Sequence, residues 1–479
     1  MLKHVNIKPS YLEAKKRSKE QVKILTDEYI MTNDLKKLGL GKKYHLITYG
    51  CQGNVRDSET ISAILEDMSF ISTDDMEDAD LIILNTCAIR ENAHNKVFGM
   101  LGRIKHLKET KPEIITILCG CMAQEVSVVE EIEKNYKWMD VVFGTHNIQN
   151  LPKLLSEAMD TNELIIEVFS KEGDIVENLP VKRDNKYKAF VNIQYGCDKF
   201  CTYCIVPFTR GKQRSRTKED ILKEVNDLIK NNYKEVTLLG QNVNAYGKDL
   251  YDDYTMSNLL IDVANTGIER VRFVTSHPWD FTDEMIDVIA KYPNIMPYIH
   301  LPLQSGSDKI LRLMGRRYTK ESYLELAKKI RERVPNCSIT TDIIVGFPNE
   351  TKEDFEETLN VVNEVKYDGA FTFIYSPREN TPAAKMEDSI SLEEKQERLY
   401  KLNELVNKYS NESNNKILNK IVPVLIEGVS TKGDNIYSGY TDTMKLVNVK
   451  CDESDLGKII NVKITDAKSW SLNGEKVDE

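Results

Sequence analysis

The chain has 479 residues, a formal net charge of −10 and 41% hydrophobic residues. No stretch offers the roughly 18 uncharged apolar residues of a membrane span, so an integral membrane protein is excluded. Nine cysteines are too sparse for a disulfide-built secreted protein, which predicts reduced thiols and a cytoplasmic location. The length suggests about three domains, and the charge means that any nucleic-acid contact must come from a local basic patch.

The first domain is predicted to be a parallel α/β sheet at 43–155. It follows a polar, lysine-rich segment at 1–42, read as a peripheral leader with a helical stretch at 11–23. Short apolar runs then alternate with amphipathic helices. Near-continuous apolar strands of this kind are covered by helices on both faces, which favours a flavodoxin-like sheet. The expected strands are 44–49, 80–85, 114–118 and 139–144.

Three cysteines follow three of these strands directly: Cys51, Cys87 and Cys121. The carboxyl ends of strands in open α/β sheets gather ligands, so the three thiols should converge. A lone cysteine is more often a small buried hydrophobe, but three at equivalent positions favour a shared site. Cys119 would share a face with Cys121. We favour Cys121, which lies beyond Gly120 where the strand gives way to a loop, and we assign Cys119 to the core.

A polar, acidic connection is expected at 156–185, despite a short apolar run at 164–169. A second alternation then fills 186–415 and predicts a partial (β/α)6 barrel. Such barrels place their chemistry at the carboxyl ends of the strands. The six expected strands are 189–195, 235–239, 270–275, 296–303, 338–345 and 369–375.

A tight run, Cys197-x3-Cys201-x2-Cys204, comes immediately after the first barrel strand. Each of the two cysteine trios is one thiolate short of a four-cysteine iron–sulfur site, which would leave one iron open to a substrate or cofactor. Zinc is the alternative. Structural zinc sites usually pair two Cys-x2-4-Cys elements or add histidines, and no second pair stands at a suitable distance.

Basic residues crowd the segment after this run, with five positive side chains in the nine residues 210–218. Such a run is usually a solvated face, but its position favours phosphate contacts beside the chemistry. The predicted RNA-binding residues are Arg210, Lys212, Arg214 and Arg216.

The last part of the chain, 416–479, is β-rich and predicts a small barrel. Its expected strands are 421–427, 437–441, 445–450 and 458–465. Nine lysines face ten acidic residues there, so charge adds little support for RNA binding.

In the tight run, the cysteines have a 3-then-2 spacing with an aromatic residue before the last one, which is similar to the signature of radical S-adenosylmethionine enzymes. The chain also contains YGCQGN (49–54), DSE (57–59), NTCAIR (85–90), GCMA (120–123), CIVPFTRG (204–211), GQNVNAY (240–246) and HLPLQSGS (300–307). Taken together, these motifs resemble those of the radical S-adenosylmethionine methylthiotransferases, and within that family the MiaB-type tRNA enzymes.

The resemblance implies two 4Fe-4S clusters and S-adenosylmethionine as cofactors. The radical cluster would be held by Cys197, Cys201 and Cys204, and an auxiliary cluster by Cys51, Cys87 and Cys121. It also implies a TRAM-like C-terminal domain. Cofactor contacts are expected from Tyr203, Gln241 and Gln304. Two departures stand out: Gly53 replaces a methionine common in the family, and Gln241 replaces a frequent glutamate.

The implied activity is the conversion of N6-isopentenyladenosine at position 37 of tRNA to its 2-methylthio form, with one S-adenosylmethionine as methyl donor and one as radical source. Expected partners are the anticodon stem-loop and an electron donor such as flavodoxin or ferredoxin. Two alternatives stay open. The same group could go to threonylcarbamoyladenosine or to a ribosomal-protein aspartate, or the chain could be a non-catalytic iron–sulfur protein that binds RNA or senses redox state.

Overall fold

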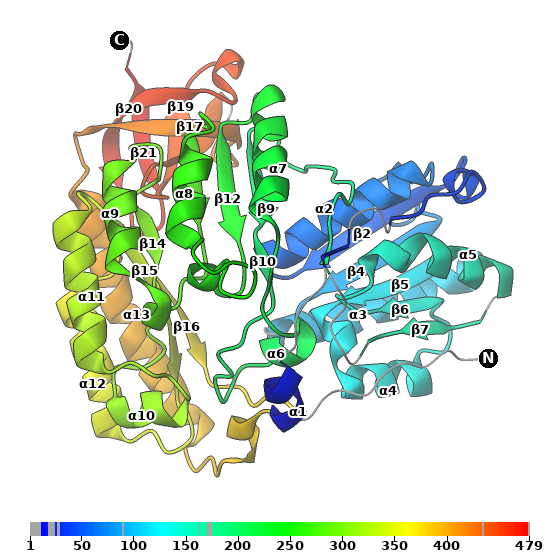
Figure 1. Ribbon diagram of the computed structural model, residues 1–479, viewed down its shortest axis with the longest axis horizontal. Coiled ribbons are helices and arrows are strands. Elements are labelled where there is room, and N and C mark those ends of the chain that lie inside the picture. The colour runs from blue at the N-terminus through cyan, green and yellow to red at the C-terminus, as the bar shows by residue number, and fades with distance from the viewer. Residues whose placement is uncertain are drawn as a thin grey trace. The chain divides into compact units, whose positions relative to one another are not determined.

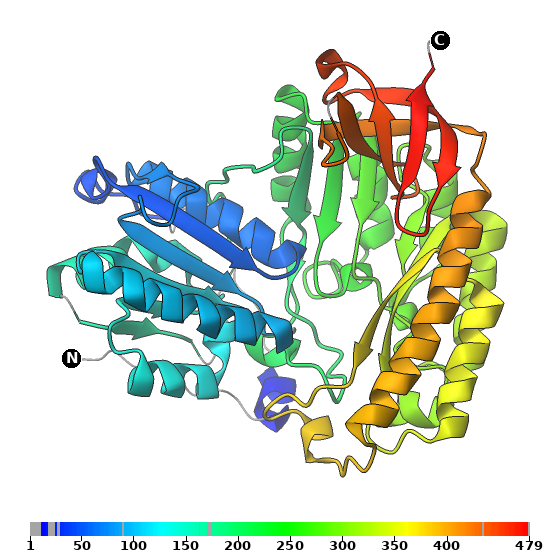
Figure 2. The same ribbon diagram turned by 180° about the vertical axis from the view of Figure 1, so that it is seen from behind.

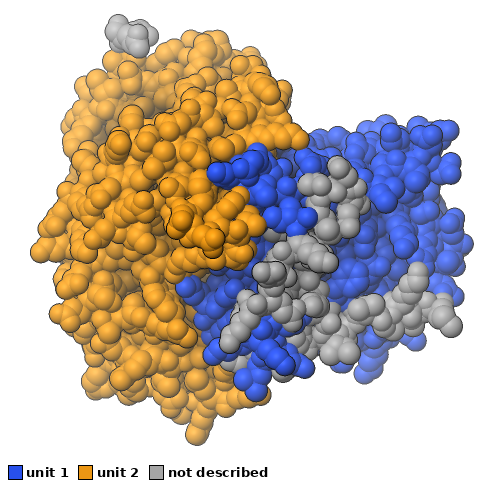
Figure 3. Space-filling view, viewed as in Figure 1, with its two compact units in different colours: residues 1–184, 192–200, 204–220 blue, residues 185–191, 201–203, 221–479 orange. Residues whose placement is uncertain are grey.

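The computed structural model describes residues 11–17, 24–25, 29–88, 91–161, 163–169, 175–433 and 435–477. It divides into two compact units (Figure 3). Unit 1 holds 1–184, 192–200 and 204–220, and unit 2 holds 185–191, 201–203 and 221–479. Among the described residues, no helix is long and apolar enough to cross a membrane.

Unit 1 is built on a six-stranded sheet in the order β3-β2-β4-β5-β6-β7, with every pair parallel. This is the flavodoxin-like order with one strand added at the edge, so the predicted fold class is confirmed. The strands are β2 (Lys43–Tyr49), β3 (Ile71–Ser72), β4 (Leu81–Thr86), β5 (Ile115–Gly120), β6 (Val141–Phe143) and β7 (Ile165–Glu167).

Helices pack on both faces of this sheet (Figures 1 and 2). Alternation along β4 sends Leu81 and Ile83 into one core cluster with α2 and α5, and Ile82 and Leu84 into another with α3 and α4. That double burial explains why the strands read as continuous apolar runs. The helices are α2 (Gln52–Asp67), α3 (Glu91–Thr110), α4 (Val126–Asn135) and α5 (Leu151–Thr161).

Two expectations about the flanks of this domain need correction. The run at 164–169 was predicted to lie in a connection, but β7 pairs with β6 and completes the sheet. The leader was predicted to be peripheral, yet Tyr29, Met31 and Leu38 pack against the core. β1 (Ile24–Leu25) also pairs with β8 (Ile175–Val176). Of the helix expected at 11–23, α1 (Tyr11–Arg17) is present, and 18–23 lie outside the described residues.

Unit 2 contains the predicted partial barrel. Its strands form two three-stranded sheets, β13-β12-β9 and β14-β15-β16, connected by a parallel bridge between Val271 and Ile295. The helices lie on the outer side of the strands (Figure 1). The strands are β9 (Lys188–Asn192), β12 (Glu235–Leu239), β13 (Arg270–Phe273), β14 (Tyr298–His300), β15 (Ser338–Val345) and β16 (Gly369–Ile374).

The barrel helices are α7 (Lys218–Lys230), α8 (Met256–Ala264), α9 (Asp283–Lys291), α10 (Asp308–Leu313), α11 (Lys320–Arg333), α12 (Lys352–Val365) and α13 (Leu392–Asn415). Side-chain caps fix where several of them begin. Thr351 and Asp354 form a capping box at the start of α12.

The C-terminal strands close into a five-stranded barrel in the order β17-β18-β19-β21-β20, which confirms the predicted small barrel. Its interior is filled by apolar side chains such as Val424, Val447 and Val462. The strands are β17 (Ile421–Val429), β18 (Ile436–Thr441), β19 (Leu446–Lys450), β20 (Ile459–Ala467) and β21 (Leu472–Lys476).

Candidate metal centres

Strand register brings the dispersed cysteines to one edge of the unit 1 sheet. Tyr49 pairs with Thr86, and Thr86 pairs with Gly120, so β2, β4 and β5 end at the same level. Cys87 directly follows the last residue of β4, and Cys121 directly follows the last residue of β5. Cys51 precedes α2, and the backbone N–H of Cys87 donates to the carbonyl of Tyr49 at 2.9 Å. The strand order reverses between β2 and β4, which is where open α/β sheets bind their ligands.

A buried amide network holds the loops that carry the cysteines. Asn54 donates to the Oδ1 of Asn85 at 3.1 Å, and Asn85 donates back to the Asn54 carbonyl at 2.9 Å and to the Ser58 hydroxyl at 2.8 Å. Asn54 and Asn85 are fully buried. Because unpaired buried amides are costly, this network fixes the start of α2 against the end of β4.

The three thiols at this edge differ in their electrostatics. A hydrogen bond with Cys87 is the main cause that lowers the pKa of Cys51, to about 5; burial opposes it, and the charge of Arg210 adds to it. Burial raises the pKa of Cys121, with Arg210 acting in the opposite direction. Cys119 is fully buried in the sheet core, where burial raises its pKa well above the ordinary value. Its assignment to the core is therefore confirmed.

Arg210 is the cation of this site. It caps α6 (Val206–Thr209) at the carboxyl end. Its Nη2 donates to Oδ2 of Asp57 at 2.6 Å, and its Nε donates to the Sγ of Cys121 at 3.2 Å. Burial alone would lower the pKa of Arg210, but Asp57, Cys121 and Cys51 raise it well above the usual value. This side chain therefore stays charged beside the sulfurs.

The predicted RNA-binding run does not form an exposed patch, because Arg210, Lys212, Arg214 and Arg216 are all at least nine-tenths buried. Arg214 donates to the carbonyl of Arg210 at 3.0 Å, and Arg216 donates through Nε to Asp220 at 2.8 Å. Part of the run forms β11 (Arg214–Ser215), which pairs with β10 (Gln194–Tyr195). These side chains are buried and have internal partners, and their role in binding phosphates stays a prediction.

The tight cysteine run has contacts in each unit. In unit 1, the N–H of Cys197 donates to the carbonyl of Gly211 at 3.1 Å, and Phe200 is buried in a cluster with Cys121. In unit 2, the backbone of Thr202 accepts from Ala383 and donates to Met314, both at 2.9 Å. Tyr203 packs edge-on against Phe347, with ring centroids 6.4 Å apart.

The predicted cofactor contacts in unit 2 follow barrel strands. Gln304 extends the β14 edge: its N–H donates to Asp342 at 2.8 Å, and its carbonyl accepts from Ile344 at 2.9 Å. Its backbone has a φ of 69°, an unusual conformation for a non-glycine residue. Gln241 follows β12 after Gly240. Their roles, like that of Tyr203, stay predictions.

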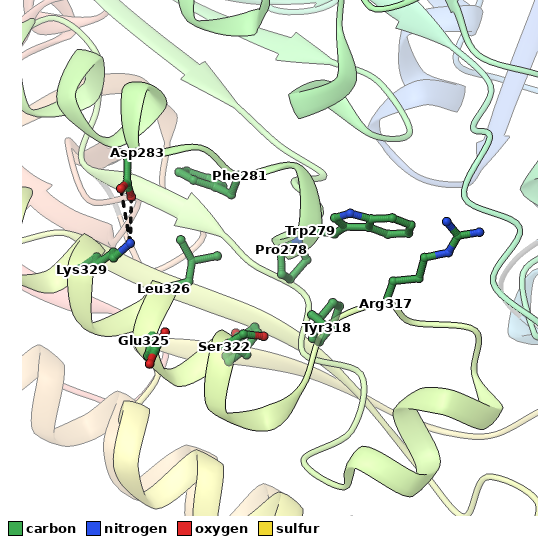
Figure 4. Close-up of a pocket in the computed structure, with 11 residues that line it drawn as sticks. Pro278, Trp279, Phe281, Asp283, Arg317, Tyr318, Ser322, Glu325, Leu326 and Lys329 are labelled. Carbon is green, nitrogen blue, oxygen red and sulfur yellow. Dashed lines mark hydrogen bonds and ion pairs between the residues drawn. The ribbon is translucent and has the colours of Figure 1, made fainter.

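A pocket of about 280 Å³ lies on the barrel in unit 2 (Figure 4). Lys329 on α11 pairs with Asp283 on α9 along its wall, at 3.2 Å. The guanidinium of Arg317 lies over the Trp279 ring, 4.6 Å from its centroid. The sequence interpretation did not single out these residues, because no motif marks contacts between segments that are distant in the sequence.

The dispersed cysteines supply the donor type that an iron–sulfur cluster uses. Among the described residues, no group of three or more His, Cys, Asp and Glu side chains is arranged to hold one metal ion. A cluster distributes its thiolates over several irons, so its ligands need not meet at one point. Thiols at the ends of neighbouring strands, with a cation beside them, fit such a group.

Comparison with known proteins identifies the family. A curated relative from Halalkalibacterium halodurans, named tRNA-2-methylthio-N(6)-dimethylallyladenosine synthase, is 56% identical over 98% of this chain and 88% of its own length. A relative of the same name from Staphylococcus epidermidis is 54% identical over 98% of this chain and 92% of its own. The chain belongs to the tRNA-2-methylthio-N(6)-dimethylallyladenosine synthase family.

Three domain models match successive parts of this chain. The model described as "Uncharacterized protein family UPF0004" matches 43–144, the Radical SAM superfamily matches 191–362, and the TRAM domain matches 416–477. Among solved structures, the radical S-adenosylmethionine methyltransferase TsrM from Kitasatospora setae is similar over 72% of this chain and 75% of its own, with a TM-score of 0.52. At 15% identity this likeness shows the fold alone.

Proposed function

We propose that this enzyme converts N6-dimethylallyladenosine at position 37 of tRNA to its 2-methylthio form. It would use one S-adenosylmethionine as methyl donor and another as radical source. The family supports a radical cluster and S-adenosylmethionine as cofactors. The second, auxiliary cluster on Cys51, Cys87 and Cys121 is part of the proposal.

The observation that carries this proposal is the convergence of the three dispersed cysteines at one sheet edge, in a chain that also has the radical cysteine motif. The shared end level of β2, β4 and β5, the low pKa of Cys51 and the adjacent Arg210 support a thiolate site there.

The clusters, when bound, would supply the electron that cleaves S-adenosylmethionine and the sulfur that is transferred. The protein's own residues hold and orient them. Cys197, Cys201 and Cys204 would ligate the radical cluster, with Tyr203, Gln241 and Gln304 near the cofactor. Adenine C2 is too inert for acid–base catalysis by side chains, which is consistent with the absence of any Ser-His-Asp motif in the sequence.

The proposed partners are the tRNA anticodon stem-loop, bound with help from the TRAM barrel, and a small reductant such as flavodoxin or ferredoxin in the cytoplasm. The basic residues of 210–216 are buried, and phosphate contacts from this segment are part of the proposal. We also propose a division into three domains, in which the first domain extends through β7 because this strand pairs with β6.

Nucleoside mass spectrometry of tRNA from a deletion strain tests the substrate. We expect 2-methylthio-N6-dimethylallyladenosine to disappear while its precursor accumulates. Loss of a methylthio group from threonylcarbamoyladenosine or from a ribosomal protein, with the dimethylallyl product unchanged, would contradict the proposal.

A second experiment separates the enzyme from a non-catalytic iron–sulfur protein. Reconstituted under anaerobic conditions with dithionite and S-adenosylmethionine, the enzyme should release 5′-deoxyadenosine, whereas a binder or sensor would not. Replacing Cys87 with alanine should abolish methylthiolation while cofactor cleavage stays measurable. Equal loss of both would argue against two separable clusters.

A further inference from the structure

Arg210 reaches two of the dispersed cysteines from a distant part of the sequence. Its Nε lies 3.2 Å from the Sγ of Cys121. A Cβ built on Gly53 would lie 3.5 Å from the Sγ of Cys51 and 3.6 Å from Nη2 of Arg210, so the guanidinium and the Cys51 sulfur flank the same small space. Only 6% of the Arg210 surface is exposed, so its guanidinium is buried at the cysteine edge of the sheet.

Asp57 sets the direction of the guanidinium. Its carboxylate accepts from Nη2 at 2.6 Å, and it lies on α2, the helix that begins directly after Cys51. A guanidinium is planar, with its donors in a fixed fork. Holding one arm on Asp57 therefore aims Nε at the sulfur of Cys121, which a flexible ammonium group could not do.

The same segment is fastened to the site at neighbouring positions. The Thr145 hydroxyl donates to the carbonyl of Thr209 at 2.6 Å, and the carbonyl of Gly211 accepts from the N–H of Cys197 at 3.1 Å. Ile205 and Phe208 are buried with Cys121. Arg210 is thus the polar member of a contact that joins residues 204–211, the continuation of the tight cysteine run, to the dispersed cysteines.

We propose that Arg210 is a positioning residue: it orients the Cys121 thiolate as a cluster ligand and fixes the 204–211 segment against the auxiliary site. This inference rests on the proposed function and replaces the predicted role of Arg210 in binding RNA. A hydrogen bond and a positive charge at a ligating sulfur also favour the reduced form of a cluster. Arg210 would therefore raise the reduction potential of the auxiliary cluster.

The chain offers a matched control for a merely structural ion pair. Arg183 pairs with Glu59 at 2.8 Å, both side chains are at least nine-tenths buried, and Glu59 is on the same helix as Asp57. Loss of this pair should disturb α2 about as much as loss of the Asp57–Arg210 pair.

The first measurement uses full-length protein in which Cys197, Cys201 and Cys204 are replaced by alanine, so that only the auxiliary site can load. Arg210→Gln, Arg210→Lys and Arg183→Gln are added separately, and iron, sulfide and the midpoint potential are determined after anaerobic reconstitution. We expect Arg210→Gln to lower iron content about twofold or more and to make the potential more negative. The iron content and potential of Arg210→Lys should lie between those of Arg210→Gln and the parent, and those of Arg183→Gln should equal the parent's.

The second measurement uses the enzyme with all six cysteines and follows methylthiolated RNA and 5′-deoxyadenosine together. Misplaced reactants commonly cost a factor of ten to a hundred in rate. We therefore expect Arg210→Gln to lower the ratio of product to 5′-deoxyadenosine roughly tenfold or more, while cofactor cleavage continues.

Unchanged iron content, potential and product ratio in Arg210→Gln would overturn the inference, and so would equal changes in Arg183→Gln. If Arg210→Gln does not fold, Asp57→Asn removes the anchor with little change of shape, and the same shifts are expected from it. Failure of the proposed function shows differently, because the parent protein itself would then hold no auxiliary cluster.

Discussion

At the scale of single residues, the site depends on backbone positions as much as on thiols. The sequence was sufficient to place Cys51, Cys87 and Cys121 at strand ends and Cys119 in the core, since strand alternation and the position of Gly120 are local properties. It could not assign Arg210, because its partner Asp57 is 153 residues away. A charge pattern along the chain does not show whether the cations face water or a buried carboxylate.

Gly120 tests the first of these points. It adopts a φ of 92°, and a Cβ there would lie 2.4 Å from Oδ1 of Asn85 and 2.6 Å from the carbonyl of Thr86. We expect Gly120→Ala to destabilise the fold by about 1–3 kcal/mol or more, because both strain and overlap oppose it. Thermal unfolding of the cofactor-free protein measures this.

Gly102, exposed on α3 with nothing near its Cβ position, is the control. Gly102→Ala should be neutral or stabilise the protein by about 0.5–1 kcal/mol. A melting temperature for Gly120→Ala equal to that of the parent would contradict the described geometry.

The lowered pKa of Cys51 makes a pH-dependent prediction for cofactor-free protein. With a pKa of about 5, Cys51 is a thiolate at pH 6–7, whereas burial raises the pKa of Cys337 to about 12. Mass spectrometry after brief iodoacetamide treatment should find Cys51 modified at pH 6–7 and Cys337 intact. The rate at Cys51 should drop as the pH falls through 5.

The same shift has a consequence for stability. A thiol whose pKa is lower in the folded state stabilises the fold fully above its ordinary pKa of 9.0, and that contribution is lost as the pH falls toward 5. Modification of Cys51 that begins only near pH 9 would show that its pKa is not lowered.

At the scale of elements, strands that continue the alternation with helices were predictable, including the three-residue β6, whereas β3 and β7 were not. β2, β4 and β5 are each six or seven residues long, enough for a pattern. β3 and β7 have two and three residues, and only pairing with a neighbouring strand identifies them. The extra edge strand therefore escaped prediction, whereas the ends of the strands that carry the cysteines did not.

The attachment of the C-terminal barrel was also invisible in the sequence. Arg272 on β13 donates to the carbonyls of Asp442 and Thr441, both at 2.7 Å, and Arg270 donates to those of Tyr440 and Pro423 at 2.9 and 3.1 Å. Both arginines are 2% exposed. Backbone carbonyls carry no residue signature, so no motif could reveal this junction.

Arg272→Met tests the junction. The substitution leaves buried carbonyls and Glu235 without their partner, a loss of about 3–5 kcal/mol for a broken buried ion pair. We expect a protease to cleave this variant between α13 and β17 faster than the parent protein, and gel electrophoresis measures the rate. The control is Lys463→Met, at an exposed position on β20, which should be cleaved at the rate of the parent protein. Equal cleavage rates for all three proteins would contradict the role of Arg272 in attaching the C-terminal barrel.

At the scale of the whole molecule, composition and hydrophobic periodicity divide the sequence into three parts. Each part matches a domain model, and the chain as a whole matches one enzyme family. The order of parts and the fold class followed from strand and helix periodicity alone. The identity of the modified base did not, because it depends on contacts that no motif encodes, and it rests on the relatives.

The most direct test of the account is the iron and sulfide content per chain after anaerobic reconstitution. Two 4Fe-4S clusters predict about eight irons and eight sulfides in the parent protein, and about four of each when Cys51, Cys87 and Cys121 are replaced by alanine. A parent that holds only about four irons under every loading condition, or only zinc, would contradict the two-site account.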